Sequence, residues 1–201
     1  MKKALFLTAA AVLILGTGSP AGASDFALFG SYLDTEDLDQ SVGGGVRAGF
    51  GNRFQLDLRA TYFPDLTEDF ESFVDDPGTD PGRFQNDVEA IPLDVGLKVN
   101  FNPAEGWNPY VGGGATYWFL DHERGEVDDE AGFYLAGGVE LARPTGGVGF
   151  FGEVIYRDVE ATVSRDPNDF EDLDDVDFDR IRNRDLDVGG VGVNAGLIWR
   201  F

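Results

Sequence analysis

The side chains best suited to do chemistry in this chain are acidic and lie toward its C-terminal end. Residues 166–179 contain nine side chains with oxygen atoms and no lysine or arginine. Hard divalent cations take about six to eight oxygen ligands, which makes this segment a candidate for Ca2+ or Mg2+. Residues 166–171 lack the third ligand and central glycine of an EF-hand, which favours loosely attracted counterions over a specific site. The candidate ligands are Asp166, Asn168, Asp172, Asp174 and Asp175.

The sequence gives little support for nucleophilic catalysis. A serine or cysteine nucleophile needs a neighbouring base, but the single histidine, His122, stands between two acidic residues. Ser72 and Ser164 lie in no recognisable nucleophile context, and the chain has no cysteine. We therefore expect no enzyme and no bound cofactor, and a disulfide or a cysteine-ligated metal is ruled out.

A second set of charged residues alternates with apolar ones. In residues 54–63 the even positions are apolar or aromatic, whereas the odd positions include Asp57 and Arg59. Because side chains alternate along a strand, the charges share the face opposite the apolar residues. In a small closed barrel such charges would fill the interior and neutralise one another. The predicted interior charges are Arg47, Asp57, Arg59, Asp94, Lys98, Glu140, Glu153 and Arg157.

Eight segments carry strand signals of this kind. Most of them are long enough for a tilted transmembrane strand, which needs about 9–11 residues. The predicted strands cover residues 25–33, 42–51, 54–63, 88–101, 109–120, 131–141, 148–159 and 186–201.

The connections between these segments alternate strictly between short and long. The short ones are rich in turn formers and cover residues 51–53, 102–108 and 142–147. The long ones are acidic and cover residues 34–41, 64–87, 121–130 and 158–185. This alternation is typical of outer-membrane barrels with periplasmic turns and extracellular loops.

A formal net charge of −22 argues against nucleic-acid binding.

The N-terminus has the features of an export signal. Lys2 and Lys3 precede an apolar run over residues 4–15, and Ala21-Gly22-Ala23 follows. This pattern is typical of a cleaved secretory signal peptide, and the run is shorter than the roughly 20 residues that span a membrane as a helix. We predict a signal peptide over residues 1–23 and one barrel domain over residues 24–201.

Alternation alone does not separate a membrane barrel from a soluble, lipocalin-like barrel with an apolar interior. Aromatic residues near the strand ends favour the membrane, because aromatic girdles lie at the bilayer interfaces. The expected girdle residues are Tyr62, Phe63, Phe101, Tyr110, Tyr117, Trp118, Phe119, Tyr156, Trp199 and Phe201.

The end of the chain carries the most specific motif. From Val191 onward, apolar residues alternate with small or polar ones, with Ile198 as the exception. Residues 194–201, Asn-Ala-Gly-Leu-Ile-Trp-Arg-Phe, resemble the C-terminal β-signal of outer-membrane proteins, and residues 108–114, Asn-Pro-Tyr-Val-Gly-Gly-Gly, resemble an entry strand of small OmpA/OmpX-like barrels. The resemblance implies an all-β fold, an eight-stranded antiparallel transmembrane up-and-down barrel in the outer membrane of a Gram-negative bacterium. It also implies that the barrel-assembly machinery reads a signal made of Asn194, Gly196, Trp199 and Phe201.

The function expected from these features is non-enzymatic, either in envelope integrity or in surface interaction through the acidic loops. Partners would be outer-membrane lipid and lipopolysaccharide, and an extracellular ligand for the loops. A narrow channel for small solutes, including apolar ones, is the alternative. A lipid-modifying enzyme ranks third.

Overall fold

Alternating strands of this sequence close into a barrel in the computed structural model. The structure describes residues 25–35, 40–70, 84–122, 126–127, 130–143, 145–164 and 183–201. The barrel strands are β1 (Asp25–Thr35), β2 (Ser41–Gly51), β3 (Phe54–Phe70), β4 (Phe84–Asn100), β5 (Trp107–His122), β7 (Glu130–Leu141), β8 (Gly147–Asp158) and β11 (Gly190–Arg200). No helix among the described residues is long and apolar enough to cross a membrane.

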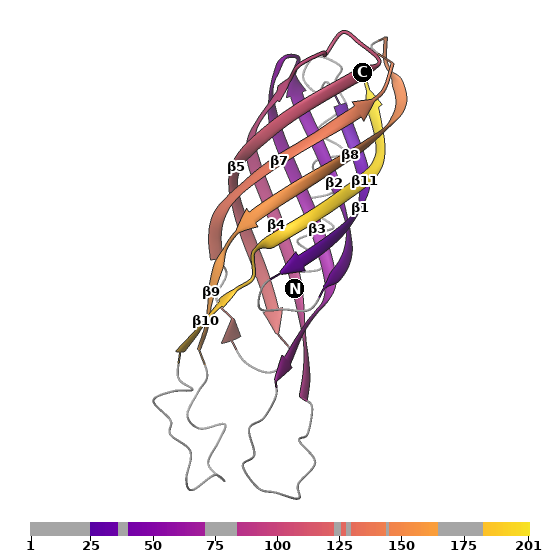
Figure 1. Ribbon diagram of the computed structural model, residues 1–201. Coiled ribbons are helices and arrows are strands. Elements are labelled where there is room, and N and C mark those ends of the chain that lie inside the picture. The colour runs from indigo at the N-terminus through magenta and orange to yellow at the C-terminus, as the bar shows by residue number, and fades with distance from the viewer. Residues whose placement is uncertain are drawn as a thin grey trace, which may run out of the picture.

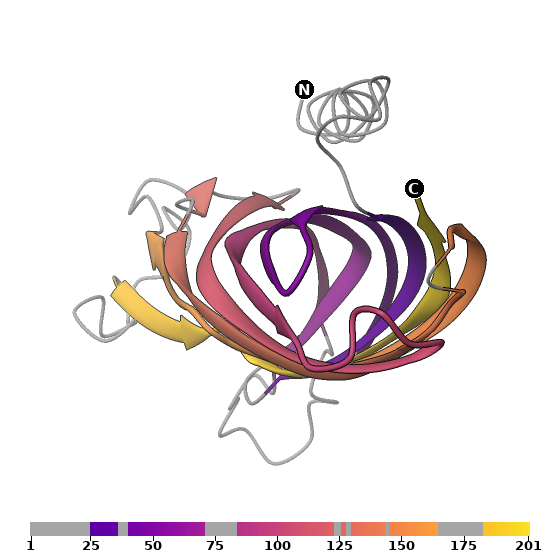
Figure 2. The same ribbon diagram turned by 90° about the horizontal axis from the view of Figure 1, so that it is seen from above.

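The eight barrel strands pair in the order β1-β11-β8-β7-β5-β4-β3-β2, and β2 returns to β1 (Figures 1 and 2). Every pairing in the barrel is antiparallel, from Asp25↔Arg200 between β1 and β11 to Leu33↔Ser41 between β1 and β2. Closure leaves the barrel no free edge, so its backbone groups are paired between strands. The expected fold class, an eight-stranded antiparallel all-β barrel, is confirmed.

The two ends of the barrel differ, as the connections predict. The C-terminus lies at the end where short turns join β2 to β3, β5 to β4 and β7 to β8 (Figure 1). At the other end, β3 and β4 continue as a paired ribbon out to Phe70↔Phe84. The connection between these strands is therefore shorter than the predicted one over residues 64–87, because β3 extends to Phe70 and β4 begins at Phe84.

A small second sheet lies at the same long-connection end. It consists of β6 (Glu126–Val127), β9 (Glu160–Ser164) and β10 (Asn183–Asp187), in the order β10-β9-β6. β9 and the first three residues of β10, 183–185, occupy a region predicted to be a loop. The predicted strand over residues 186–201 is also interrupted, because Val188 and Gly189 both donate backbone hydrogen bonds to the Val159 carbonyl. Gly190 follows with a φ of 155°, a value that favours glycine and turns the chain into β11.

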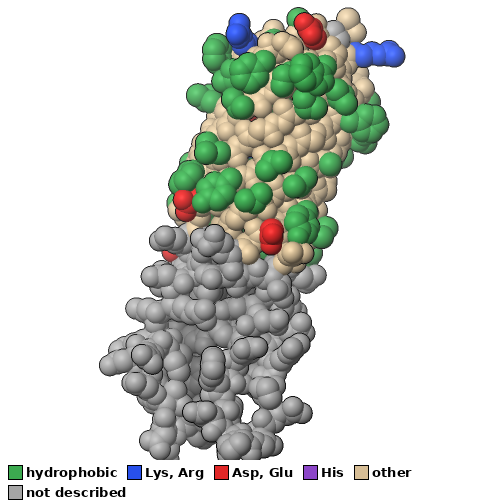
Figure 3. Space-filling view, in the orientation of Figure 1, with side chains coloured by type: hydrophobic (Ala, Val, Ile, Leu, Met, Phe, Trp, Pro, Cys, Tyr) green, Lys and Arg blue, Asp and Glu red, His purple; other side chains and the backbone are tan. Residues whose placement is uncertain are grey.

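The outside of the barrel is apolar over its middle. Val95, Val111, Val154 and Val193 are each about half exposed. On the face shown in Figure 3, charged side chains lie only near the two ends of the described surface. An apolar band bounded by polar ends suits a barrel that contacts lipid.

Three of the predicted girdle residues face the inside instead. Phe63, Tyr110 and Trp118 are at most 2% exposed. Phe63 follows Tyr62 and Trp118 follows Tyr117, and adjacent residues of a strand point to opposite faces. Only one member of each of these pairs can reach lipid. Tyr110 shares the inward face of β5 with the buried Asn108 and Thr116, so the expectation was wrong for all three. Tyr117 and Tyr156 remain exposed on the outside.

Candidate functional site: the lumenal charge network

The predicted interior charges all lie within the barrel. Each is at most 4% exposed, and each forms an ion pair with at least one oppositely charged side chain. With their polar neighbours they form what we call the lumenal network, to which all eight barrel strands contribute. Its members are Asp25 (β1), Arg47 (β2), Gln55, Asp57 and Arg59 (β3), Asp94, Lys98 and Asn100 (β4), Asn108, Tyr110 and Thr116 (β5), Glu140 (β7), Glu153 and Arg157 (β8), and Asn194 and Arg200 (β11).

Glu140 is the centre of the network near the short-turn end. Its Oε1 accepts hydrogen bonds from Arg47 Nη2 and Lys98 Nζ, each at 2.7 Å. Its Oε2 accepts from Arg200 Nη2 at 2.7 Å and from Asn108 Nδ2 at 3.1 Å. One carboxylate on β7 therefore holds donors from four other strands. Lys98 Nζ also lies 3.4 Å from Asp25 Oδ2, which brings in β1.

Glu153 is the second centre, on the neighbouring strand β8. Its Oε1 accepts from Arg59 Nη1 at 2.5 Å and from Asn194 Nδ2 at 2.8 Å. Its Oε2 accepts from the Tyr110 hydroxyl at 2.8 Å. Arg59 also donates to Asp57 through Nε at 2.6 Å, so its guanidinium joins carboxylates on β3 and β8.

Arg47 links the two glutamates. Its Nη2 donates to Glu140, and its Nη1 donates to the Tyr110 hydroxyl at 3.0 Å and lies 3.8 Å from Glu153 Oε2. Its guanidinium carbon also lies 4.5 Å from the centroid of the Phe151 ring, a distance suited to a cation–π contact. The guanidinium is thus held by both charge and aromatic contacts.

A separate ion pair lies toward the long-connection end. Arg157 on β8 donates to Asp94 on β4, from Nη2 at 2.7 Å and from Nε at 3.3 Å. The Thr116 hydroxyl donates to Asp94 Oδ1 at 2.6 Å, and Trp118 Nε1 donates to Thr116 Oγ1 at 3.1 Å. A chain of hydrogen bonds therefore runs from the ion pair to an indole ring.

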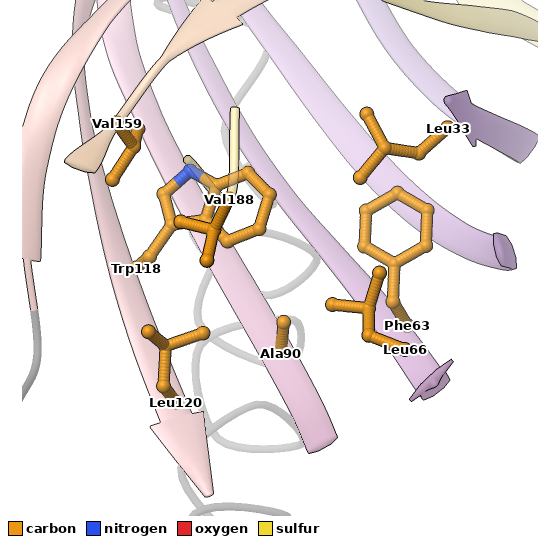
Figure 4. Close-up of a cluster of buried hydrophobic side chains, with 8 residues drawn as sticks. All are labelled: Leu33, Phe63, Leu66, Ala90, Trp118, Leu120, Val159 and Val188. Carbon is orange, nitrogen blue, oxygen red and sulfur yellow. The ribbon is translucent and has the colours of Figure 1, made fainter. Parts of the chain in front are cut away.

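That indole belongs to a cluster of apolar side chains that we call the apolar plug (Figure 4). All its members are at most 3% exposed and come from strands around the ring or from the segments that flank them. The plug consists of Leu33, Phe63, Leu66, Ala90, Trp118, Leu120, Val159 and Val188. A polar interior is thus capped by an apolar layer on the side where the long connections leave the barrel.

The residues of the predicted β-signal lie on both faces of β11 and just after it. Asn194 is fully buried in the lumenal network, and Gly196 lies against Phe29. Trp199 faces outward, with its ring 6.1 Å from that of Phe26, and Phe201 is 67% exposed. Ile198, the exception to the alternation, points inward and packs with Phe29 and Phe151.

In the lumenal network, the carboxylates and the cations neutralise one another. Buried carboxylates and cations are tolerated when they are paired and hydrogen-bonded. Each of the predicted interior charges has an oppositely charged partner within 4 Å. The described residues contain no group of three or more His, Asp or Glu side chains that could hold a metal ion. The candidate cation ligands Asp166, Asn168, Asp172, Asp174 and Asp175, together with the predicted signal peptide, lie outside the described residues.

Sequence reasoning missed several network members. Asp25, Tyr110, Asn108 and Arg200 were not expected to share a cluster with the predicted charges. Strand parity could have found Arg200, because it lies on the face of its strand opposite the apolar residues. Asp25, Asn108 and Tyr110 lie on strands in which no interior charge was predicted. Their bonding partners follow from the strand register, which alternation alone does not provide.

Comparisons with known proteins agree with this architecture. The sequence model of the family described as outer membrane protein beta-barrel domain matches residues 7–196. The structure is similar to that of the outer membrane protein OprG from Pseudomonas aeruginosa, with a TM-score of 0.66 and 15% identity over 90% of this chain and 97% of that one. It is also similar to Neisserial surface protein A (NspA), with a TM-score of 0.53 and 13% identity over 90% of this chain and 97% of that one. No curated protein matches the chain in sequence. At these identities, the likeness to the two structures concerns the fold alone.

Proposed function

The chain belongs to the outer membrane protein beta-barrel domain family, and from that premise we propose that it is a closed, non-enzymatic barrel of a Gram-negative outer membrane. Its lumen stabilises the barrel, and its function lies in the acidic loops that it holds at the cell surface.

The observation that carries this proposal is the filling of the lumen. Two ion pairs cross it, from Arg59 on β3 to Glu153 on β8 and from Arg157 on β8 to Asp94 on β4. The buried side chains of the apolar plug lie beyond them, toward the long-connection end. A permeating ion would have to displace paired buried charges and then cross a layer of buried apolar side chains, and both steps are costly.

Conductance in planar lipid bilayers tests the closed state directly. We expect no discrete current steps from the wild-type protein. A Phe63→Ala/Trp118→Ala/Leu120→Ala variant, which removes the largest plug side chains, provides the comparison in which steps should become detectable. Arg143→Ala, in an exposed turn, is the matched control and should stay silent.

The channel alternative predicts the opposite result. Discrete steps from the wild-type protein that change in Arg59→Ala or Arg157→Ala would contradict the closed barrel. They would assign the charged lumen to solute passage, and the same assay therefore separates the two functions.

The loops are tested by deletion. Because β3 and β4 pair out to Phe70 and Phe84, a deletion confined to residues 71–83 spares the paired ribbon. A second deletion removes residues 166–179. We expect both variants to fold and to lose binding to an extracellular ligand or to lipopolysaccharide.

Altered lipid A or phospholipid in cells overproducing the wild-type protein would instead support a lipid-modifying enzyme.

A further inference from the structure

The two faces of the terminal strand β11 differ in how much their side chains vary along the strand. Its outward face is uniformly apolar at Val191, Val193, Ala195, Leu197 and Trp199. Its inward face is irregular, and each position contacts something different. We propose that the inward face of β11 sets the register in which the barrel closes, which makes Asn194, Gly196 and Arg200 positioning residues in assembly.

Asn194 marks one position on the inward face. It is fully buried, and its Nδ2 donates to Glu153 Oε1 at 2.8 Å. Asn194 lies opposite Glu153 in the β11–β8 ladder and opposite Ser31 in the β1–β11 ladder. Glu153 is also held by Arg59 and Tyr110, so the amide meets a carboxylate whose place is fixed by other strands.

Gly196 marks the next inward position by having no side chain. A Cβ atom there would lie 2.8 Å from Phe29 Cβ and would collide with the Leu28 carbonyl oxygen. Phe29 in turn packs edge-on against Phe151, with ring centroids 6.0 Å apart. The space beside residue 196 is therefore taken by an aromatic side chain that is itself held in place.

Arg200 marks the end of the strand. Its Nη2 donates to Glu140 Oε2 at 2.7 Å, and its Nη1 donates to the Ala142 carbonyl at 3.4 Å. Between these polar contacts, Ile198 fills an apolar site with Ala27 and Phe151. From residue 194 to residue 200, the inward face of β11 presents an amide, a position without a side chain, an apolar side chain and a cation.

These contacts matter because the outward face cannot distinguish neighbouring registers. A slip of one residue would turn every side chain to the opposite face and is strongly disfavoured. A slip of two residues would keep apolar side chains toward the lipid. On the inward face, however, the same slip would carry Asn194 or Ile198 into the space of Phe29 and would separate Arg200 from Glu140. Discrimination against the two-residue slip must come from the inside.

Engineered cysteine pairs can measure the register, because the chain has no cysteine. Leu28 lies opposite Leu197 in the native ladder, so Leu28→Cys/Leu197→Cys reports the native register after oxidation. Leu28→Cys/Trp199→Cys reports a slip of two residues. Directly opposed positions are close enough for a disulfide, whereas diagonal ones are too far apart. Each pair is refolded, oxidised, and read by electrophoresis and mass spectrometry of the linked peptides.

The decisive variant moves the inward pattern by two residues and leaves the outward face unchanged. It combines Asn194→Gly, Gly196→Asn, Ile198→Gly and Arg200→Ile. We expect the 28–197 disulfide to fall at least tenfold and the 28–199 disulfide to replace it. The matched control, Val193→Ala/Ala195→Val, alters only the outward face and should keep the 28–197 disulfide at wild-type yield.

A milder variant covers the case in which the shifted pattern does not fold. Asn194→Gly removes only the amide contact, and we expect both the 28–197 and 28–199 disulfides to form. If Asn194→Gly gives the 28–197 disulfide alone at wild-type yield, the proposal is wrong. It is equally wrong if the shifted variant folds and keeps the native pairing.

Discussion

At the scale of single residues, the lumen depends on two glutamates on neighbouring strands. Glu140 and Glu153 together accept hydrogen bonds from side chains on β2, β3, β4, β5 and β11. Their desolvation in the barrel interior is offset by these charge-assisted bonds. Removing one carboxylate leaves several buried cations without their partner, which is a larger perturbation than the loss of one surface ion pair.

Glu140→Gln should therefore strongly destabilise the folded barrel. The amide keeps the volume of the side chain but leaves Arg47, Lys98 and Arg200 short of a counter-charge. We expect a loss of about 3 kcal/mol in the free energy of unfolding, the size typical of breaking a buried ion pair. Urea unfolding in lipid vesicles, followed by tryptophan fluorescence, measures it. Glu105→Gln, in an exposed turn, is the control, and equal midpoints for the two variants would contradict the role given to Glu140.

At the scale of elements, alternation predicted a segment for each barrel strand and placed eight of the charges on inward faces. Asp57 and Arg59 alternate with Leu56 and Leu58, so the face to which each belongs could be read directly. The same rule, applied strictly to the neighbours Tyr117 and Trp118, would have placed the indole inside. The aromatic cluster was instead assigned to the membrane interface as one group.

Other features depend on contacts that a single strand does not contain. Glu140 binds side chains from four other strands, and those partners become neighbours only when the barrel has closed with its native register. The short strands β9 and β10 lie in an acidic stretch where the apolar alternation is weak. Their pairing with each other, rather than their own composition, defines them.

Trp118 offers a test of the apolar plug as an element. It is fully buried and joined through Thr116 to the Asp94–Arg157 pair. Trp118→Ala should leave a cavity and cost about 3–5 kcal/mol, as for other buried large-to-small substitutions. Val111→Ala, on the outward face of the same strand, should cost less than about 1 kcal/mol because no closed cavity forms. Guanidinium unfolding in vesicles compares the two, and a Trp118→Ala loss no larger than that of Val111→Ala would mean that the plug is loosely packed.

At the scale of the whole molecule, charge is distributed unevenly along the barrel axis. Arg53 and Arg143 are exposed in the short turns, whereas the long connections at the opposite end hold most of the 37 acidic residues. In an outer membrane, that acidic end would meet lipopolysaccharide, which is itself anionic. Divalent cations can bridge two anionic surfaces through shared oxygen ligands.

Removing divalent cations should therefore destabilise the protein in vesicles that contain lipopolysaccharide, and the effect should depend on the acidic loops. We expect EDTA to lower the thermal unfolding midpoint there and to speed proteolysis of the loops, with Ca2+ or Mg2+ restoring both. In zwitterionic detergent, EDTA should have no effect, because no anionic lipid is present there for a cation to bridge to the loops. A variant with the acidic residues of 166–179 replaced by asparagine and glutamine should fold normally and lose the EDTA response in vesicles. If the wild-type protein is insensitive to EDTA in those vesicles, the loops do not contact lipopolysaccharide through cations, and their negative charge serves solubility alone.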